Sequence, residues 1–140
     1  MLSKVRIVGI WLAVPYLVWI LYLLISPGGG PVEGLNLEPF ATLTRQYRFL
    51  DTDVFLLQVM GNVGLLLPFG ILAAVWNRSL VKTLVYVLTG SIVIEVVQYA
   101  PLVSRVADVD DVILNVAGGL VGWLLGWPLA RMLQNAAAEN

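Results

Sequence analysis

Four apolar segments dominate this chain of 140 residues, and each is long enough to cross a lipid bilayer as a helix. A helix rises about 1.5 Å per residue, so about 20 residues span the roughly 30 Å of hydrocarbon. The sequence therefore predicts an all-α membrane protein with a single domain over residues 1–140. We expect a bundle of four transmembrane helices at residues 7–25, 54–76, 80–99 and 112–132, with an outer loop at residues 26–53.

Composition supports a bilayer location and excludes several kinds of site. Apolar residues make up 59% and charged residues 12% of the chain, whereas a soluble domain carries roughly a quarter charged residues. The net charge of −1 and the lack of a basic run argue against nucleic acid as a partner. Cysteine and histidine do not occur, which excludes disulfides, zinc sites built on these residues, cysteine nucleophiles and histidine triads. We expect no cofactor and no resident metal.

The first apolar segment could also be read as a secretory signal, because Lys4 and Arg6 precede it and Ser26-Pro27-Gly28 follows. Its apolar core is too long for a signal, and no Ala-x-Ala-like cleavage site follows. A retained helix is therefore the favoured interpretation, with the signal peptide as the alternative.

Lysine and arginine positions predict the orientation of the bundle. If four helices alternate, five basic residues lie on one side, namely Lys4, Arg6, Arg78, Lys82 and Arg131, and three on the other, namely Arg45, Arg48 and Arg105. The positive-inside rule then places both termini in the cytoplasm. The outward side carries most of the acids: Glu33, Glu38, Asp51, Asp53, Asp108, Asp110 and Asp111.

The outer loop contains a candidate interfacial helix. After the turn-forming run from Ser26 to Pro31, apolar residues recur at helical spacing at Phe40, Leu43, Tyr47 and Leu50. This pattern predicts a short helix lying on the outer leaflet. An irregular loop with scattered apolar residues is the alternative.

Polar side chains gather at the outer ends of three predicted helices. An ionisable group in the middle of a bilayer costs roughly 2.5 to 3.5 kcal/mol, so a chain keeps one only where something offsets this cost. Counted by helical rise, Asn62 lies roughly 13 Å and Glu95 roughly 7 Å below the outer boundary, and Asn115 is similarly shallow. The predicted polar cluster comprises Asn62, Glu95, Gln98, Arg105, Asp108, Asp111 and Asn115.

Spacing predicts how this cluster is arranged. Glu95 and Gln98 are three residues apart, and Asp111 and Asn115 are four apart, so each pair shares a helix face. Arg105, on the turn between them, can bind one or two carboxylates through its planar guanidinium. A purely structural role, fastening the third helix to the fourth, remains an alternative because polar groups act as modest interhelical glue. Functional use is favoured, because four or more ionisable groups are a costly way to join two helices.

The fourth predicted helix carries a stripe of glycines at Gly118, Gly122 and Gly126. Such a stripe lets another helix approach closely. It could form a homodimer, but packing inside one chain is favoured because Asn115 should point inward with the stripe. Thr89-Gly90-Ser91 on the third helix offers a matching small patch.

Several of these residues resemble a known family in order and spacing. From about Asn36 to Gly126 the chain is similar to the VanZ-like family, through the following motifs: Asn36-Leu37-Glu38-Pro39-Phe40, Gly61-Asn62, Pro68-Phe69-Gly70, Glu95-x-x-Gln98, and Arg105-x-x-Asp108-x-x-Asp111-x-x-x-Asn115-x-x-Gly118. The resemblance implies a small multi-pass protein of the bacterial cell (inner) membrane. The namesake of that family confers low-level resistance to the glycopeptide teicoplanin. The seven residues of the predicted cluster are carried over as a family signature, not as catalytic groups.

Two functions of different classes follow. In the favoured one, the protein is a non-catalytic envelope module whose outward pocket binds membrane lipid, a lipid-linked or cell-wall component, or a lipoglycopeptide, with Arg105 meeting an anionic group and the apolar helix walls holding the tail. In the alternative, it is a membrane-embedded enzyme acting on a lipid phosphate or envelope ester. Glu95 or Asp111 would then be the general acid or base, Arg105 would stabilise negative charge, and carboxylates could hold Mg²⁺ or Ca²⁺. No nucleophile is specified, since Ser104 lacks a histidine partner. A transport role, for which a helix kink at Pro68 is the only hint, is a third possibility.

Overall fold

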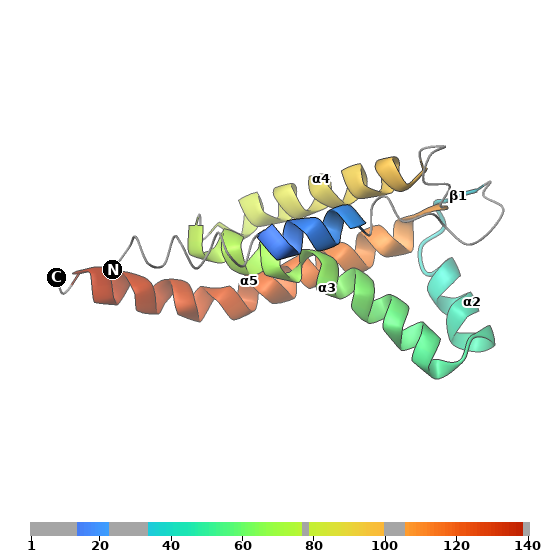
Figure 1. The fold of residues 1–140 in the computed structure, drawn as a ribbon, viewed down its shortest axis with the longest axis horizontal. Coiled ribbons are helices and arrows are strands. Elements are labelled where there is room, and N and C mark those ends of the chain that lie inside the picture. Colours follow the sequence, from blue (N-terminus) through green and yellow to red (C-terminus); the bar gives the residue numbers. More distant parts are fainter. Residues whose placement is uncertain (1–13, 23–33, 77–78, 100–105, 139–140) are drawn as a thin grey trace.

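The computed structural model describes residues 14–22, 34–76, 79–99 and 106–138, and the following description concerns these residues. Residues 14–22 are helical. The elements that follow are β1 (Leu35–Asn36), α2 (Ala41–Phe49), α3 (Thr52–Trp76), α4 (Leu80–Tyr99), β2 (Ala107–Asp108) and α5 (Val109–Ala138). Figure 1 shows α4 and α5 running along the long axis with α3 crossing beside them, while α2 and the two strands gather at one end. We call this the polar end of the bundle; it holds Tyr99, Asp108 and Val109.

Three of the described helices are long and apolar enough to cross a membrane: Thr52–Trp76, Leu80–Tyr99 and Val109–Leu133. The all-helical, membrane-type architecture expected from the sequence is therefore confirmed. The first predicted span, at residues 7–25, is described only over residues 14–22, where the chain is helical. The rest of that span lies outside the described residues, so a bundle of four spans stays a prediction.

Helix boundaries agree closely with the sequence except at the two ends of α5, which continues to Ala138, six residues beyond the predicted end at residue 132. The observed α4 coincides with the predicted segment 80–99, and α3 begins two residues before the predicted segment 54–76. In contrast, α5 begins at Val109, three residues before the predicted start at residue 112. The prediction was wrong there because it assigned the acidic run to a turn. Acidic residues are favourable in the first turn of a helix, where they face the positive end of its dipole.

The glycine stripe of α5 packs against the backbone of α3. A Cβ atom added at Gly118 would lie 1.9 Å from the carbonyl oxygen of Val63, and one at Gly122 would lie 2.0 Å from that of Leu67. From the α3 side, a Cβ at Gly70 would lie 2.0 Å from the carbonyl oxygen of Gly119. The two helices therefore meet backbone to backbone, which only glycine permits.

The small patch that matches the glycine stripe lies on α3 and not, as the sequence suggested, at Thr89-Gly90-Ser91 of α4. A Cβ at Gly90 would have no atom within 4 Å. Helix α4 instead contacts α5 at Ser91, which accepts a hydrogen bond from Asn115, and at Val87, whose side chain lies against Gly119; both residues are buried. Most of the remaining α4 surface is exposed and apolar, as expected for a helix that faces acyl chains.

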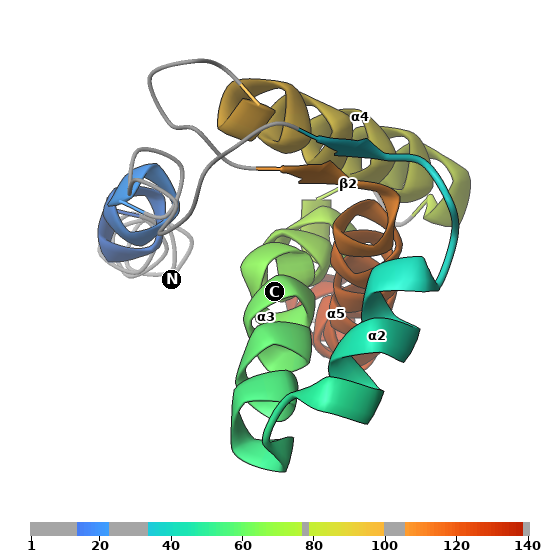
Figure 2. The same cartoon turned by 90° about the vertical axis from the view of Figure 1, so that its right-hand side faces the viewer.

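Two short strands, which the sequence did not predict, join distant parts of the chain at the polar end. Strand β1 pairs in parallel with β2, with Leu35 opposite Ala107 and Asn36 opposite Asp108. Figure 2 looks onto this end and shows the strand pair between α4 and the first turn of α5, with α2 beside α5. Each strand has two residues, too few for the alternation of polar and apolar residues that marks a strand.

Candidate functional site

Asp108 joins three segments of the chain at the polar end. Its Oδ1 atom accepts hydrogen bonds from the backbone N–H of Asp110, at 2.9 Å, and from the side-chain amide of Asn36, at 3.1 Å. The backbone N–H of Asp108 donates to Oε2 of Glu95 in α4, at 2.9 Å. Because its carboxylate binds the second amide of α5, Asp108 is the N-cap of that helix. The same side chain fixes the position of β1 relative to α5.

Asp110 caps a different helix, α2. Its carboxylate accepts hydrogen bonds from the backbone N–H groups of Phe40 and Leu43, the latter at 3.0 Å. The N-cap position of α2 is Phe40, which has a left-handed backbone (φ 65°) and makes no capping hydrogen bond through its own side chain. The buried carboxylate of Asp110, from α5, thus accepts the hydrogen bonds that a serine or aspartate at the N-cap position itself usually accepts.

The sequence left the role of Asp110 open. The signal that could have identified it is the absence of Ser, Thr, Asp or Asn immediately before α2, where Pro39-Phe40 stands instead. A helix that lacks a local cap needs an acceptor from elsewhere in the fold, or water, for its first amides.

Asn36 shapes the approach to α2. Its Oδ1 accepts a hydrogen bond from the backbone N–H of Glu38 at 3.1 Å, which forms a tight local turn. Its amide nitrogen donates to Thr42 at 2.9 Å as well as to Asp108. The segment from Asn36 to Phe40 is therefore fixed at both ends by hydrogen bonds, one from the Asn36 side chain to Asp108 and one from the Phe40 backbone to Asp110.

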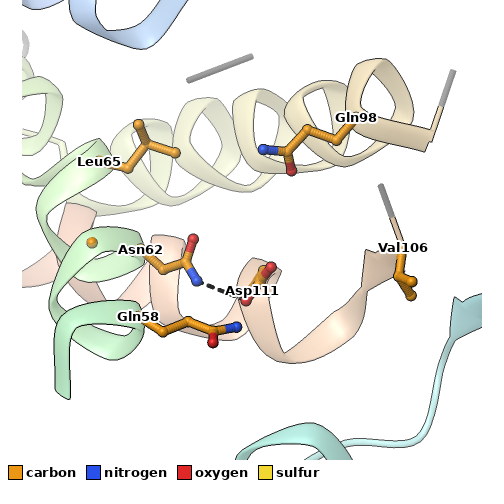
Figure 3. A pocket seen from close by; sticks show the side chains of 7 residues that line it. Gln58, Asn62, Leu65, Gln98, Val106 and Asp111 are labelled. Atoms are coloured by element: carbon orange, nitrogen blue, oxygen red, sulfur yellow. Dashed lines mark hydrogen bonds between the residues drawn. The ribbon is translucent and has the colours of Figure 1, made fainter. Parts of the chain in front are cut away.

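A cavity of about 370 Å³ lies between α3, α4 and α5 at the polar end. Its lining comprises Gln58, Gly61, Asn62, Leu65, Gln98, Val106 and Asp111. Figure 3 shows Asn62 of α3 and Asp111 of α5 pointing toward one another, with Gln98 approaching from α4. The Asn62 amide donates to Oδ1 of Asp111 at 2.7 Å. Predicted site residues from three helices thus line one space.

A second cavity, of about 500 Å³, shares Gln58, Val106 and Asp111 with the first. Its other lining residues are Gly34, Leu35, Asn36, Thr42, Arg45, Gln46 and Asp108. We refer to the two adjoining cavities together as the polar groove. Helix α2 presents Thr42, Arg45 and Gln46 to it, a spacing that puts all three on one helix face. The Oε1 atom of Gln46 is buried and finds no hydrogen-bond partner in the described part of the chain.

Two predicted site residues lie instead in a closed seam between α4 and α5. Glu95 is 6% exposed and Asn115 is 0% exposed, and neither lines the polar groove. The amide nitrogen of Asn115 donates to Oγ of Ser91 at 3.1 Å. The predicted cluster is therefore divided between a seam, with Glu95 and Asn115, and an open groove, with Asn62, Gln98, Asp108 and Asp111.

Arg105 lies outside the described residues, so its predicted pairing with carboxylates stays a prediction. No group of three or more acidic side chains converges as a set of metal ligands in the described segments. The groups that the groove itself can present to a bound molecule are carboxylate oxygens, amide oxygens, amide N–H groups and the guanidinium of Arg45.

The seam gives a test of the structural role of Asn115. Ser91→Ala should lower the free energy of unfolding by about 1 kcal/mol or more, because it leaves the buried Asn115 amide without its acceptor. Adding Asn115→Leu should recover that stability, since the double variant buries no unpaired polar group. Unfolding in mixed micelles, followed by tryptophan fluorescence, measures both changes. A double variant that loses at least as much stability as the two single variants combined would contradict the assignment.

Comparisons with known proteins agree with the sequence motifs. A family model described as VanZ/LLP1 matches residues 11–131. Neither the curated proteins nor the solved structures that were searched contain a match.

Proposed function

Because this chain belongs to the VanZ/LLP1 family, we propose that it is a multi-pass protein of the bacterial cell membrane and that its polar groove binds an envelope amphiphile. The ligand would be a lipid-linked or cell-wall component or a lipoglycopeptide, bound without chemical change. The observation that carries this proposal is the groove itself. Asn62, Gln98 and Asp111, from three helices long and apolar enough to cross a membrane, converge on one open space.

Charge distribution supports placing the groove at the outer leaflet. Lys82 and Arg131 lie toward the ends of α4 and α5 opposite the polar end, whereas Arg45 and Arg48 of α2 lie at the polar end. Counted over the whole sequence, five basic residues fall on the side of Lys82 and Arg131 and three on the side of the groove, so the positive-inside rule favours the former side for the cytoplasm. Arg131 also lies over the ring of Trp127, 4.1 Å from its centroid, a pairing suited to the membrane–water interface.

Helix α2 has the character of an interfacial element. Its polar face lines the groove, whereas Phe40, Tyr47 and Phe49 leave most of their surface exposed. Aromatic side chains are favoured at headgroup level, where they are partly in water and partly in lipid. Leu57, which precedes the groove-lining Gln58 on α3, is also exposed. A polar space with apolar surface next to it suits a molecule with a polar head and an acyl tail.

The position of Glu95 favours binding over catalysis. A general acid or base must reach the proton that it transfers, directly or through one water. Glu95 is buried, accepts a hydrogen bond from the Asp108 backbone and lines neither cavity of the groove. Asp111 does line the groove, where it accepts a hydrogen bond from the Asn62 amide, so of these two acids only Asp111 could serve the catalytic alternative.

Filling the groove from Gly61 tests this proposal. Gly61 lines the first cavity, and a Cβ atom added to it would have nothing within 4 Å, so Gly61→Phe should occupy space without forcing helices apart. Gly90→Phe is the matched control, because Gly90 also has open space around it but lines neither cavity. Wild-type protein in nanodiscs is expected to bind teicoplanin or an undecaprenyl-linked peptidoglycan precursor.

We expect Gly61→Phe to weaken that binding by about tenfold or more, which corresponds to about 1.4 kcal/mol. Gly90→Phe should bind as the wild type does. The proposal fails if the wild type binds neither probe, or if Gly61→Phe and Gly90→Phe bind equally well.

A further inference from the structure

The polar groove contains mainly groups that both donate and accept hydrogen bonds. Five side-chain amides and one hydroxyl line it, together with two carboxylates and one guanidinium: Asn36, Gln46, Gln58, Asn62, Gln98, Thr42, Asp108, Asp111 and Arg45. Each amide offers an oxygen acceptor and two N–H donors. A sugar hydroxyl also donates and accepts at one atom, so such a lining is complementary to a group with many hydroxyls.

The two carboxylates of the groove act as hydrogen-bond acceptors. Oδ1 of Asp108 already accepts from two N–H groups, and Oδ1 of Asp111 accepts from the Asn62 amide. An ionised carboxylate repels a second anion but accepts hydrogen bonds from hydroxyls. Arg45, which is exposed on α2, lies at the surface of the groove. The interior chemistry therefore favours an uncharged polyol over a phosphate.

Gln46 is a further reason to favour an uncharged polyol over a phosphate as the ligand. Gln46 lines the second cavity of the groove, and its Oε1 atom is buried and has no partner in the described residues. A buried acceptor of this kind is stabilised by a donor. A sugar hydroxyl supplies a donor, whereas a fully ionised phosphate supplies none. The volumes of about 370 and 500 Å³ lie within the range of small-molecule sites.

We infer that the polar groove recognises the sugar headgroup of a glycolipid-type ligand, with Gln46 and Asn62 among the residues that contact its hydroxyls. This inference rests on the proposed function, because it names the chemical class of the ligand for the same groove. Gln46 approaches from α2 and Asn62 from α3, on the two cavities that share Gln58 and Asp111. A sugar spanning both cavities would join these two helices.

The experiment compares three probes that share one dodecyl chain carrying a photoreactive diazirine. One has a glucoside headgroup, one a phosphate and one a free hydroxyl. Full-length protein in phosphatidylcholine nanodiscs is irradiated with each, and the labelled peptides are quantified by mass spectrometry. The expected result is saturable labelling of α2 and α3 by the glucoside, about tenfold above that by the other two probes. This comparison uses the wild type and needs no variant to fold.

Variants then locate the contact. Gln46→Leu and Asn62→Leu should each lower glucoside labelling about fivefold to tenfold, since each leaves a hydroxyl without its partner. Labelling by the free alcohol should not change. Gly61→Phe should abolish glucoside labelling, and Gly90→Phe should leave it intact.

The possible failures are distinguishable. Stronger labelling by the phosphate probe, still blocked by Gly61→Phe, would overturn recognition of a sugar while leaving a ligand-binding groove in place. Glucoside labelling that is indifferent to both Gln46→Leu and Asn62→Leu would also overturn it. If no probe depends on Gly61, the proposed function fails together with the inference.

Discussion

Replacing Gly118 or Gly122 by leucine is expected to prevent the bundle from folding. A Cβ atom at these positions would lie 1.9 and 2.0 Å from carbonyl oxygens of α3, far inside van der Waals contact. These atoms belong to the backbone, so they cannot move aside as a flexible side chain does. Overpacking a core with added methylene groups already costs about 1–3 kcal/mol, and separating two helices along their length should cost more. Even alanine should be strongly destabilising at both positions.

Gly90 on α4 provides the comparison, because a Cβ atom added there meets nothing within 4 Å. Yield of monodisperse protein and thermal unfolding should therefore be unaffected in Gly90→Leu and severely reduced in Gly118→Leu and Gly122→Leu. If the three variants behaved alike, the contact between α3 and α5 would not be the core of the fold.

The second large effect is expected for Asp110→Ala, which should release α2 from the polar end. The substitution removes two hydrogen bonds to the first amides of α2. Loss of a helix N-cap costs about 0.5–2 kcal/mol, and hydrogen bonds to a charged group contribute about 1.5–3 kcal/mol each. Because α2 is short and has no buried residue of its own, a loss of this size should unfold it locally while α3, α4 and α5 remain packed.

Trypsin measures this local opening directly. Arg45 and Arg48 lie in α2 and are exposed, and proteolysis of a transiently opened segment follows its open population. Cleavage at these two arginines should accelerate about tenfold or more in Asp110→Ala. Glu38 is an exposed acid just before α2, and Glu38→Ala is therefore the control variant. Equal cleavage rates in Asp110→Ala, Glu38→Ala and the wild type would show that Asp110 does not hold α2.

Features of the chain that depend on local pattern were predictable from the sequence. Residues 80–99 form a long, predominantly apolar segment, and the observed α4 has those bounds. The family resemblance read from the spaced acids and amides is confirmed by the match over residues 11–131. Helical spacing across Phe40, Leu43, Tyr47 and Leu50 predicted a helix where α2 lies.

Features that depend on contacts between distant residues were not predictable. The caps provided by Asp110 and the pairing of Asn36 with Asp108 join positions about 70 residues apart in the chain. Knowing that two residues share a helix face was also not enough to predict which neighbouring helix each one contacts. Asp111 and Asn115 are four residues apart, yet Asp111 contacts Asn62 of α3 and Asn115 contacts Ser91 of α4. A helix packed between two others gives neighbouring positions different partners, and sequence spacing alone does not say which.

The central claim, that the polar groove opens at the outer surface of the membrane, is most directly tested by single-cysteine labelling in intact cells. The chain contains no cysteine, so Gln58→Cys, which lines both cavities, and Asn135→Cys, exposed near the far end of α5, each report one position. A membrane-impermeant maleimide should label Gln58→Cys in intact cells and Asn135→Cys only after permeabilisation. Labelling of Asn135→Cys in intact cells, with Gln58→Cys reached only after permeabilisation, would place the groove in the cytoplasm and contradict the account.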